Sequence, residues 1–198
     1  MTQLEELNNF ISSSVFSTLK PETRADILQC KARLQSHEVL KMFQNLNRNK
    51  IGNCYAPHKP IMLLAIMELV ARGLVTSTKI ILDKELKDTF KKVWEYTVPV
   101  GSSFTCEYRN PFTYMDKSFW TPTADRNVAI ISADVLSAMK DADTRNILVS
   151  CLTDMVINDT VDDIHNIYNI ESSDNIFKAA EDLMIAIPFI GSCLSLLA

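Results

Sequence analysis

The sequence of 198 residues predicts an α+β fold that is mostly helical, with a small β-hairpin or sheet and helical extensions at both ends. Apolar side chains recur at intervals of three and four residues through most of the chain, as in helices that bury one face. Strand-like segments are confined to short stretches at 79–82, 104–120 and 128–131. The chain has only 4 glycines, which is too few for a turn-rich all-β fold.

The first part of the chain predicts three helices. Residues 3–17 and 21–34 have helical spacing, and Pro21 suits the first helical position, where a missing N–H group costs nothing. Ser36 is a suitable cap for a third helix. The apolar face of that helix comprises Val39, Leu40, Phe43 and Leu46.

A polar, basic loop at 47–57 leads into the most apolar helical segment of the chain. Residues 60–72 are apolar nearly all round, which predicts a central and buried helix. Pro60 is expected at the first helical position, and Gly73 just beyond the last turn.

The segments that follow alternate between strand-like and helical patterns. A short strand is expected at 79–82, followed by a helix that Asp83 caps. Residues 104–120 predict a β-hairpin, and 128–131 predict a further strand. From Ser132 onward the chain is again helical.

The C-terminal part is first acidic and then apolar. Residues 134–182 hold eleven carboxylates and three cations, and residues 183–198 hold no charge. The tail is short for a membrane span, so it is expected to pack on the domain or on a partner, with membrane association as the alternative. The predicted division is an N-terminal extension at 1–35, a domain at 36–158 and an acidic extension at 159–198.

Composition and motifs exclude several classes of function. The 5 cysteines are widely spaced and form no C-x-x-C pair, which indicates reduced thiols and neither a disulfide framework nor a zinc site. Glycine-rich phosphate-binding motifs are absent from the sequence, and no cofactor is expected. The acidic start of the chain lacks the pattern of a signal peptide, which predicts a cytoplasmic location.

The start of the predicted central helix is the strongest candidate for a binding site. Residues 31–60 hold six basic residues and one acidic residue, although the whole chain has a net charge of -4. His58 and Lys59 precede Pro60 where helical N–H groups and the helix dipole favour an anion such as phosphate. The alternative is that His58 only caps the helix and Lys59 is a solvated surface charge.

Two motifs resemble a known family. Residues 55–67 read YAPHKPIMLLAIM, and roughly fifty residues later 109–115 read RNPFTYM, followed by Phe119 and Trp120. In order and spacing these motifs are similar to the sulfur-binding domain that reads phosphorothioate DNA in modification-dependent HNH restriction endonucleases, and to related N-terminal domains of other HNH endonucleases. The resemblance covers residues 36–158.

The resemblance implies that the basic loop and the second motif meet at the DNA backbone, around one non-bridging phosphate atom. An apolar cup there would favour sulfur over oxygen, because sulfur is less hydrated and its transfer out of water costs less hydration free energy. The implied DNA and phosphate contacts are Arg48, Lys50, His58, Lys59 and Arg109. The implied sulfur cup comprises His58, Asn110, Pro111, Phe112 and Tyr114, with Pro111 at the key proline position.

The sequence departs from the family pattern at two positions of the cup. Asn110 stands where sulfur-reading members have an aromatic residue, and Tyr114 stands near a position that is small in them. The polar amide of Asn110 would attract water into the cup, and the bulky ring of Tyr114 would narrow it. The resemblance to the family therefore supports DNA binding by this chain more strongly than it supports specificity for sulfur.

No catalytic set can be assembled from the sequence. An HNH nuclease needs paired histidines, an asparagine and usually a metal ion, whereas His37, His58 and His165 lie far apart. Glu85 and Lys87, which follow Asp83, faintly resemble the carboxylate–lysine set of another nuclease class, but they fall in the first turn of a helix, where acids favour the dipole. Neither catalytic residues nor a metal site is expected.

The predicted function is a non-catalytic DNA-binding module of a restriction or defence system that recognises modified duplex DNA, with phosphorothioate as the candidate modification. Expected partners are duplex DNA, a separate nuclease or other protein, and a second copy of the chain, but not a membrane. The first rival is an interaction or regulatory protein on the same scaffold whose DNA site has decayed. The weaker rival is a nuclease with unrecognised residues.

Overall fold

The computed structural model describes residues 3–52 and 54–168, with side chains up to residue 158. The apolar tail at 183–198 lies outside these residues. The fold is mostly helical with small antiparallel sheets, which confirms the predicted α+β class. The helices are α1 Gln3–Ile11, α2 Ser14–Thr18, α3 Pro21–Gln44, α4 His58–Ala71, α5 Lys84–Thr97, α6 Arg109–Thr113, α7 Ala133–Lys140 and α8 Ala142–Tyr168. The strands are β1 Lys50–Ile51, β2 Cys54–Tyr55, β3 Lys79–Ile81, β4 Trp120–Pro122 and β5 Val128–Ile131.

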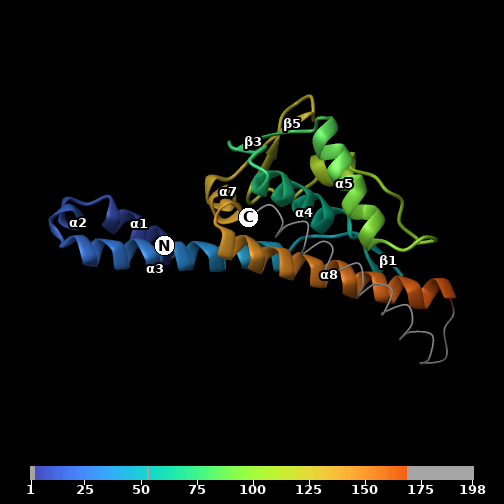
Figure 1. The fold of residues 1–198 in the computed structure, drawn as a ribbon, viewed down its shortest axis with the longest axis horizontal. Coiled ribbons are helices and arrows are strands. Elements are labelled where there is room, and N and C mark those ends of the chain that lie inside the picture. Colours follow the sequence, from blue (N-terminus) through green and yellow to red (C-terminus); the bar gives the residue numbers. More distant parts are fainter. Residues whose placement is uncertain (1–2, 53, 169–198) are drawn as a thin grey trace.

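Two long helices form the base of the molecule. In Figure 1, α3 and α8 lie along the longest axis and contact each other, with α4, α5 and the larger sheet stacked on one side of them. The first half of α3 extends beyond this body, and α1 and α2 fold back along it. We call residues 3–38 the N-terminal arm; they comprise this projecting part and the next turns of α3, where Gln35 and Ser36 reach Asp134 and Thr144.

The helix boundaries in the arm differ from the predicted ones in two places. The single helix predicted at 3–17 is broken after Ile11, and there the hydroxyl of Ser13 donates to the carbonyl of Phe10 at 2.6 Å. The break predicted at Ser36 is absent, because α3 runs without interruption to Gln44. Ser36 instead donates its hydroxyl to the carbonyl of Ala32 at 2.8 Å, as serine does inside a helix.

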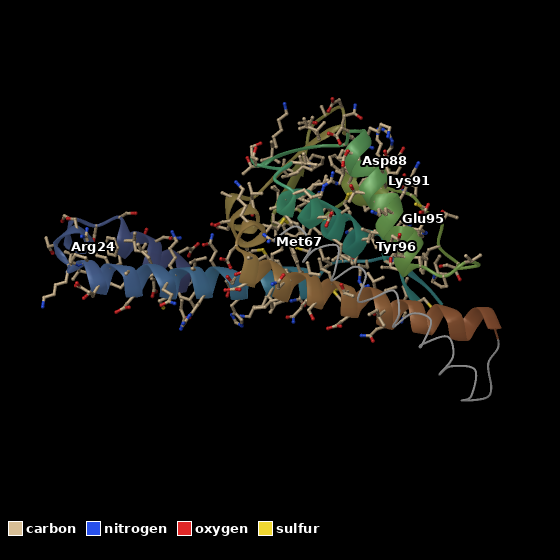
Figure 2. The ribbon with its side chains drawn as sticks, viewed as in Figure 1. Arg24, Met67, Asp88, Lys91, Glu95 and Tyr96 are labelled. Carbon is tan, nitrogen blue, oxygen red and sulfur yellow. The ribbon has the colours of Figure 1, made fainter. Side chains whose placement is uncertain are left out.

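The core is built around α4. All residues of α4 from Pro60 to Val70 except Glu68 are buried, which confirms the central helix that the sequence predicts. Its partners are α5 on one side and α8 on another, and Figure 2 shows Met67 near the middle of the packed body. The helix ends as expected at Gly73, which has φ of 70° and donates its N–H to Val70 at 3.0 Å.

The strands β3, β5 and β4 form one antiparallel sheet in that order. The strands expected at 79–82 and 128–131 are confirmed, as is the Asp83 cap, whose carboxylate accepts the N–H of Leu86 at 3.0 Å. The hairpin predicted at 104–120 is wrong. That stretch contains the short helix α6, and the hairpin is formed by β4 and β5 instead.

The basic loop contains local order that the sequence did not predict. Strands β1 and β2 pair within it, with Lys50 opposite Tyr55 and Ile51 opposite Cys54. The side chain of Cys54 is buried, so this hairpin is attached to the core. Among the described residues, none of the helices combines the length and the apolar character that crossing a bilayer requires.

Candidate functional site

The site begins at the N-terminus of α4, which starts two residues earlier than expected. Pro57 is the cap residue, and its carbonyl accepts the N–H of Ile61 at 3.0 Å, which closes the first turn. His58 and Lys59 are therefore the first two helical residues, and Pro60 is the third. Pro60 fits there because the first-turn N–H groups have no partner within the helix.

His58 connects this helix start to the loop that precedes α6. Its Nε2–H donates to the carbonyl of Thr105 at 2.8 Å. Its ring lies 4.7 Å from the ring of Trp94 and 6.0 Å edge-on from Phe104, between ring centroids. Burial lowers the pKa of His58, against smaller opposing effects of the Thr105 hydrogen bond and the Glu107 carboxylate. His58 is thus a neutral positioning group at neutral pH rather than a cation.

Lys59 connects the same helix start to the beginning of the basic loop. Its ammonium donates to the carbonyl of Asn47 at 2.5 Å. Partial burial lowers the pKa of Lys59, and the nearby carboxylate of Asp116 opposes that shift. The lysine therefore holds the loop in place with one of its three N–H donors, and it is not the solvated charge of the alternative reading.

Two further cations come from the loop and its hairpin. The guanidinium of Arg48 and the ammonium of Lys50 each lie 4.9 Å from the centre of the Tyr55 ring. A cation above an aromatic face is attracted by the ring quadrupole. The exposed ring of Tyr55 therefore gathers both charges at one edge of the loop.

The second motif enters the site through α6. The carboxylate of Glu107 accepts the N–H groups of Arg109 and Asn110, both at 2.7 Å, and so caps this helix. Residues three and four apart share a side of a helix, so Tyr114 lies on the side of both Pro111 and Asn110, and all three line the cavity.

Phe112 points away from the cavity, which corrects its predicted place in the sulfur cup. Its side chain is 0% exposed and lies edge-on to Trp120, with 5.2 Å between ring centroids. The indole N–H of Trp120 donates to the carbonyl of Phe112 at 2.7 Å. In a strand, alternate residues share a face, so Phe112 would point to the same side as Asn110 and Tyr114. Because this segment is helical, Phe112 points to a different side.

These segments line one cavity of about 650 Å³ that is open to solvent. Its walls come from the basic loop with β1, from the start of α4, and from the loop and helix around α6. The lining residues are Arg48, Asn49, Lys50, Ile51, Ala56, His58, Lys59, Phe104, Glu107, Asn110, Pro111 and Tyr114. Three of them are basic and one is acidic, and Pro111 and Phe104 supply apolar surface.

The cavity brings together seven of the nine predicted site residues. Arg48, Lys50, His58, Lys59, Asn110, Pro111 and Tyr114 line it. Arg109 is exposed on α6 and does not line the cavity, and Phe112 is in the core.

Sequence reasoning missed Glu107, Phe104, Tyr55 and Arg126. Arg126 comes from the β4–β5 turn, where it has φ of 56°, and donates to the Tyr114 hydroxyl at 3.4 Å. Glu107 could have been found as a cap, since it stands just before Asn110 and Pro111, had that segment been predicted as a helix. No signal in the sequence links Arg126 to the site, because only the fold brings the β4–β5 turn to α6.

The arrangement can bind an anion but offers no assembled catalytic metal site. Within residues 3–52 and 54–168, no three histidine, cysteine, aspartate or glutamate side chains are grouped so that they could hold a metal ion. No protein-family model matches the sequence, and a search of curated proteins finds no match.

Proposed function

We propose that the chain is a DNA-binding module that holds the sugar–phosphate backbone at the cavity between the basic loop, α4 and α6. The observation that carries the proposal is the convergence of Arg48, Lys50 and Lys59 on a cavity whose far wall is formed by Asn110 and Pro111. Backbone phosphates are bound mainly through such cations. The negative charge of the chain is concentrated at 134–182, where eleven carboxylates stand against three cations, so no general attraction of DNA to the whole chain is expected.

Modified duplex DNA is the substrate that the motif resemblance favours, with a phosphorothioate linkage as the candidate modification. Pro111 supports this choice because it is buried in the cavity wall and its ring offers no hydrogen bond to a phosphate oxygen. A restriction or defence system is the setting in which a module that reads modified DNA without cutting it would act.

The test is a fluorescence-anisotropy titration of the full chain with matched ordinary and phosphorothioate duplexes at 50 and 200 mM salt. We expect affinity that falls steeply with salt for both duplexes, and tighter binding of the modified one. Salt-independent binding, or none at 50 mM salt, would exclude the backbone site. Equal affinity for the two duplexes would be consistent with DNA binding but would contradict the proposed preference for phosphorothioate.

Cleavage is not part of the proposed function. Asp83 caps α5, and Glu85 pairs with Arg72 at 2.8 Å, so both carboxylates have structural roles. We expect no cleavage of duplex DNA with Mg²⁺, Mn²⁺ or Zn²⁺. Cleavage that is lost in Asp83→Ala or Glu85→Ala would establish the nuclease alternative.

A second candidate function is self-association through the N-terminal arm. Although the arm contains α1, α2 and three quarters of α3, none of its residues from 3 to 38 is buried. Phe10, Val15 and Leu28 are exposed on it, and its four basic and five acidic side chains nearly balance, so a second copy would not be repelled. Short helices gain most of their stability from packing, and a second arm would supply it.

Sedimentation of the full chain across a range of protein concentrations tests this candidate. We expect a dimer that Leu28→Glu dissociates and that Gln29→Glu, an exposed neighbour on α3, leaves intact. A wild-type chain that stays monomeric at every concentration would exclude self-association.

A further inference from the structure

The cavity is larger than the contact with one phosphate atom requires. A volume of about 650 Å³ lies within the range of pockets that enclose whole small molecules. A cup for one sulfur or oxygen atom needs only a shallow concavity. The remaining space has room for a larger part of the nucleotide.

An exposed aromatic ring stands at the rim of this cavity. Tyr114 follows α6 directly, and 59% of its surface is exposed. The guanidinium of Arg126 lies 5.7 Å from the ring centre and donates to the hydroxyl, which limits the ring's orientations. Exposed aromatic rings accompanied by cations are the surfaces on which proteins stack unpaired bases.

The side-chain amide of Asn110 lines the same cavity as that ring. The main chain of Asn110 is fixed on both sides, because its N–H donates to Glu107 and its carbonyl accepts the N–H of Tyr114 at 2.8 Å. Its side chain is exposed, and its amide has no hydrogen-bond partner among the residues that the structure describes. An amide both donates and accepts, so it can pair with the edge of a base.

We propose that the cavity accepts a single unpaired nucleotide of the bound DNA. The base stacks on Tyr114 and its edge pairs with Asn110, while Arg48 and Lys50 hold the adjoining phosphate. A base inside a duplex cannot reach this position, so the nucleotide must be bulged, mismatched or rotated out of the stack. This inference rests on the proposed DNA binding and adds the nucleotide class that the site selects.

The experiment compares a fully paired duplex with the same duplex carrying one extra, bulged nucleotide. The full chain is titrated into each at one salt concentration, with fluorescence anisotropy as the readout. We expect the bulged duplex to bind about tenfold more tightly, as one stacked base typically contributes. A 2-aminopurine placed at the bulge should lose fluorescence on binding, because its ring stacks on tyrosine.

Three variants separate the stacking contact from general DNA affinity. Tyr114→Leu and Asn110→Ala should each remove most of the preference for the bulged duplex, measured as the ratio of the affinities for the bulged and the paired duplex. Tyr96→Leu is the matched control, because Tyr96 lies on α5, is 40% exposed and does not line the cavity. Circular dichroism and melting temperatures show that each variant is folded.

The outcomes distinguish the inference from the function on which it rests. Salt-dependent binding without any preference for the bulge overturns the inference and leaves the backbone site intact. A bulge preference that Tyr114→Leu and Tyr96→Leu affect equally also overturns it. If neither DNA is bound, the proposed function and the inference both fail.

Discussion

At the scale of single residues, the groups that the sequence marks most clearly serve both the fold and the site. His58 and Lys59 were predicted as anion ligands, yet His58 donates to Thr105 and Lys59 donates to Asn47. These two bonds fasten the loop before α6 and the basic loop to the start of α4. Arg48 and Lys50, which are held over Tyr55, are the better candidates for direct phosphate contacts.

The role of Pro111 leads to a prediction about discrimination. Pro111→Ser introduces a hydroxyl into the apolar part of the wall, where it favours oxygen over sulfur. Pro111 is in the first turn of α6, so its replacement breaks no helical hydrogen bond. The ratio of affinities for phosphorothioate and ordinary duplexes should therefore fall toward one, while affinity for ordinary DNA changes little. Pro99→Ser, outside the cavity, is the control, and a ratio that Pro111→Ser leaves unchanged would contradict this role.

The environment of His58 leads to a prediction about pH. Burial lowers its pKa in the folded protein below the ordinary value of 6.5, so the unfolded chain takes up the proton first as pH falls. As the pH falls below 6.5, His58 therefore lowers the free energy of unfolding progressively. This loss stops growing when the pH reaches the lowered pKa of His58 in the folded protein. Well above pH 6.5, His58 has no such effect. Urea unfolding at pH 8 and pH 5.5 should show a smaller loss on acidification in His58→Gln than in the wild type.

The exposed His37 provides the comparison for this measurement. His37→Gln should keep the pH dependence of the wild type, because that side chain is exposed on α3. If His58→Gln and the wild type lose equal stability between pH 8 and pH 5.5, the proton of His58 is not linked to folding.

At the scale of elements, the sequence predicted α4 and α5 well and the segment around α6 poorly. Continuous apolar residues specify α4, and the Asp83 cap specifies α5, so local patterns suffice for both. The alternating residues at 104–120 also fit a strand, and the deciding interactions are the Glu107 cap and the Trp120 bond to Phe112. The second of these depends on β4, which no local pattern places beside α6.

The assignment of α6 as a helix predicts opposite effects for two neighbouring aromatic residues. Phe112→Ala should lower the free energy of unfolding by about 3–5 kcal/mol, because it removes a fully buried ring from the core. Tyr114→Ala should change it by only about 0.5 kcal/mol, because the ring is mostly exposed. Chemical denaturation measures both, and equal losses would indicate that the two rings share one face, as in a strand.

At the scale of the whole molecule, the distribution of charge matters more than its sum. The chain has a net charge of -4, but its cavity is lined by three basic residues and one acidic residue. The sequence could locate the basic segment and the second motif separately. Their meeting in one cavity depends on α4, whose buried length fixes the basic loop at its start and supports α6 along its side.

The central claim is that this cavity binds DNA phosphates, and a salt titration of a charge-neutralised cavity tests it most directly. The logarithm of the association constant for one duplex is measured against the logarithm of salt concentration for wild type, for Arg48→Gln/Lys50→Gln and for Lys79→Gln/Lys91→Gln. Lys79 and Lys91 are exposed and do not line the cavity, and their replacement removes the same charge. We predict that the magnitude of this slope decreases by about 1.8 in the cavity variant, about 0.9 for each phosphate contact that is removed. The control variant should keep the wild-type slope. Equal slopes for the cavity variant and the control would contradict the assignment of the site.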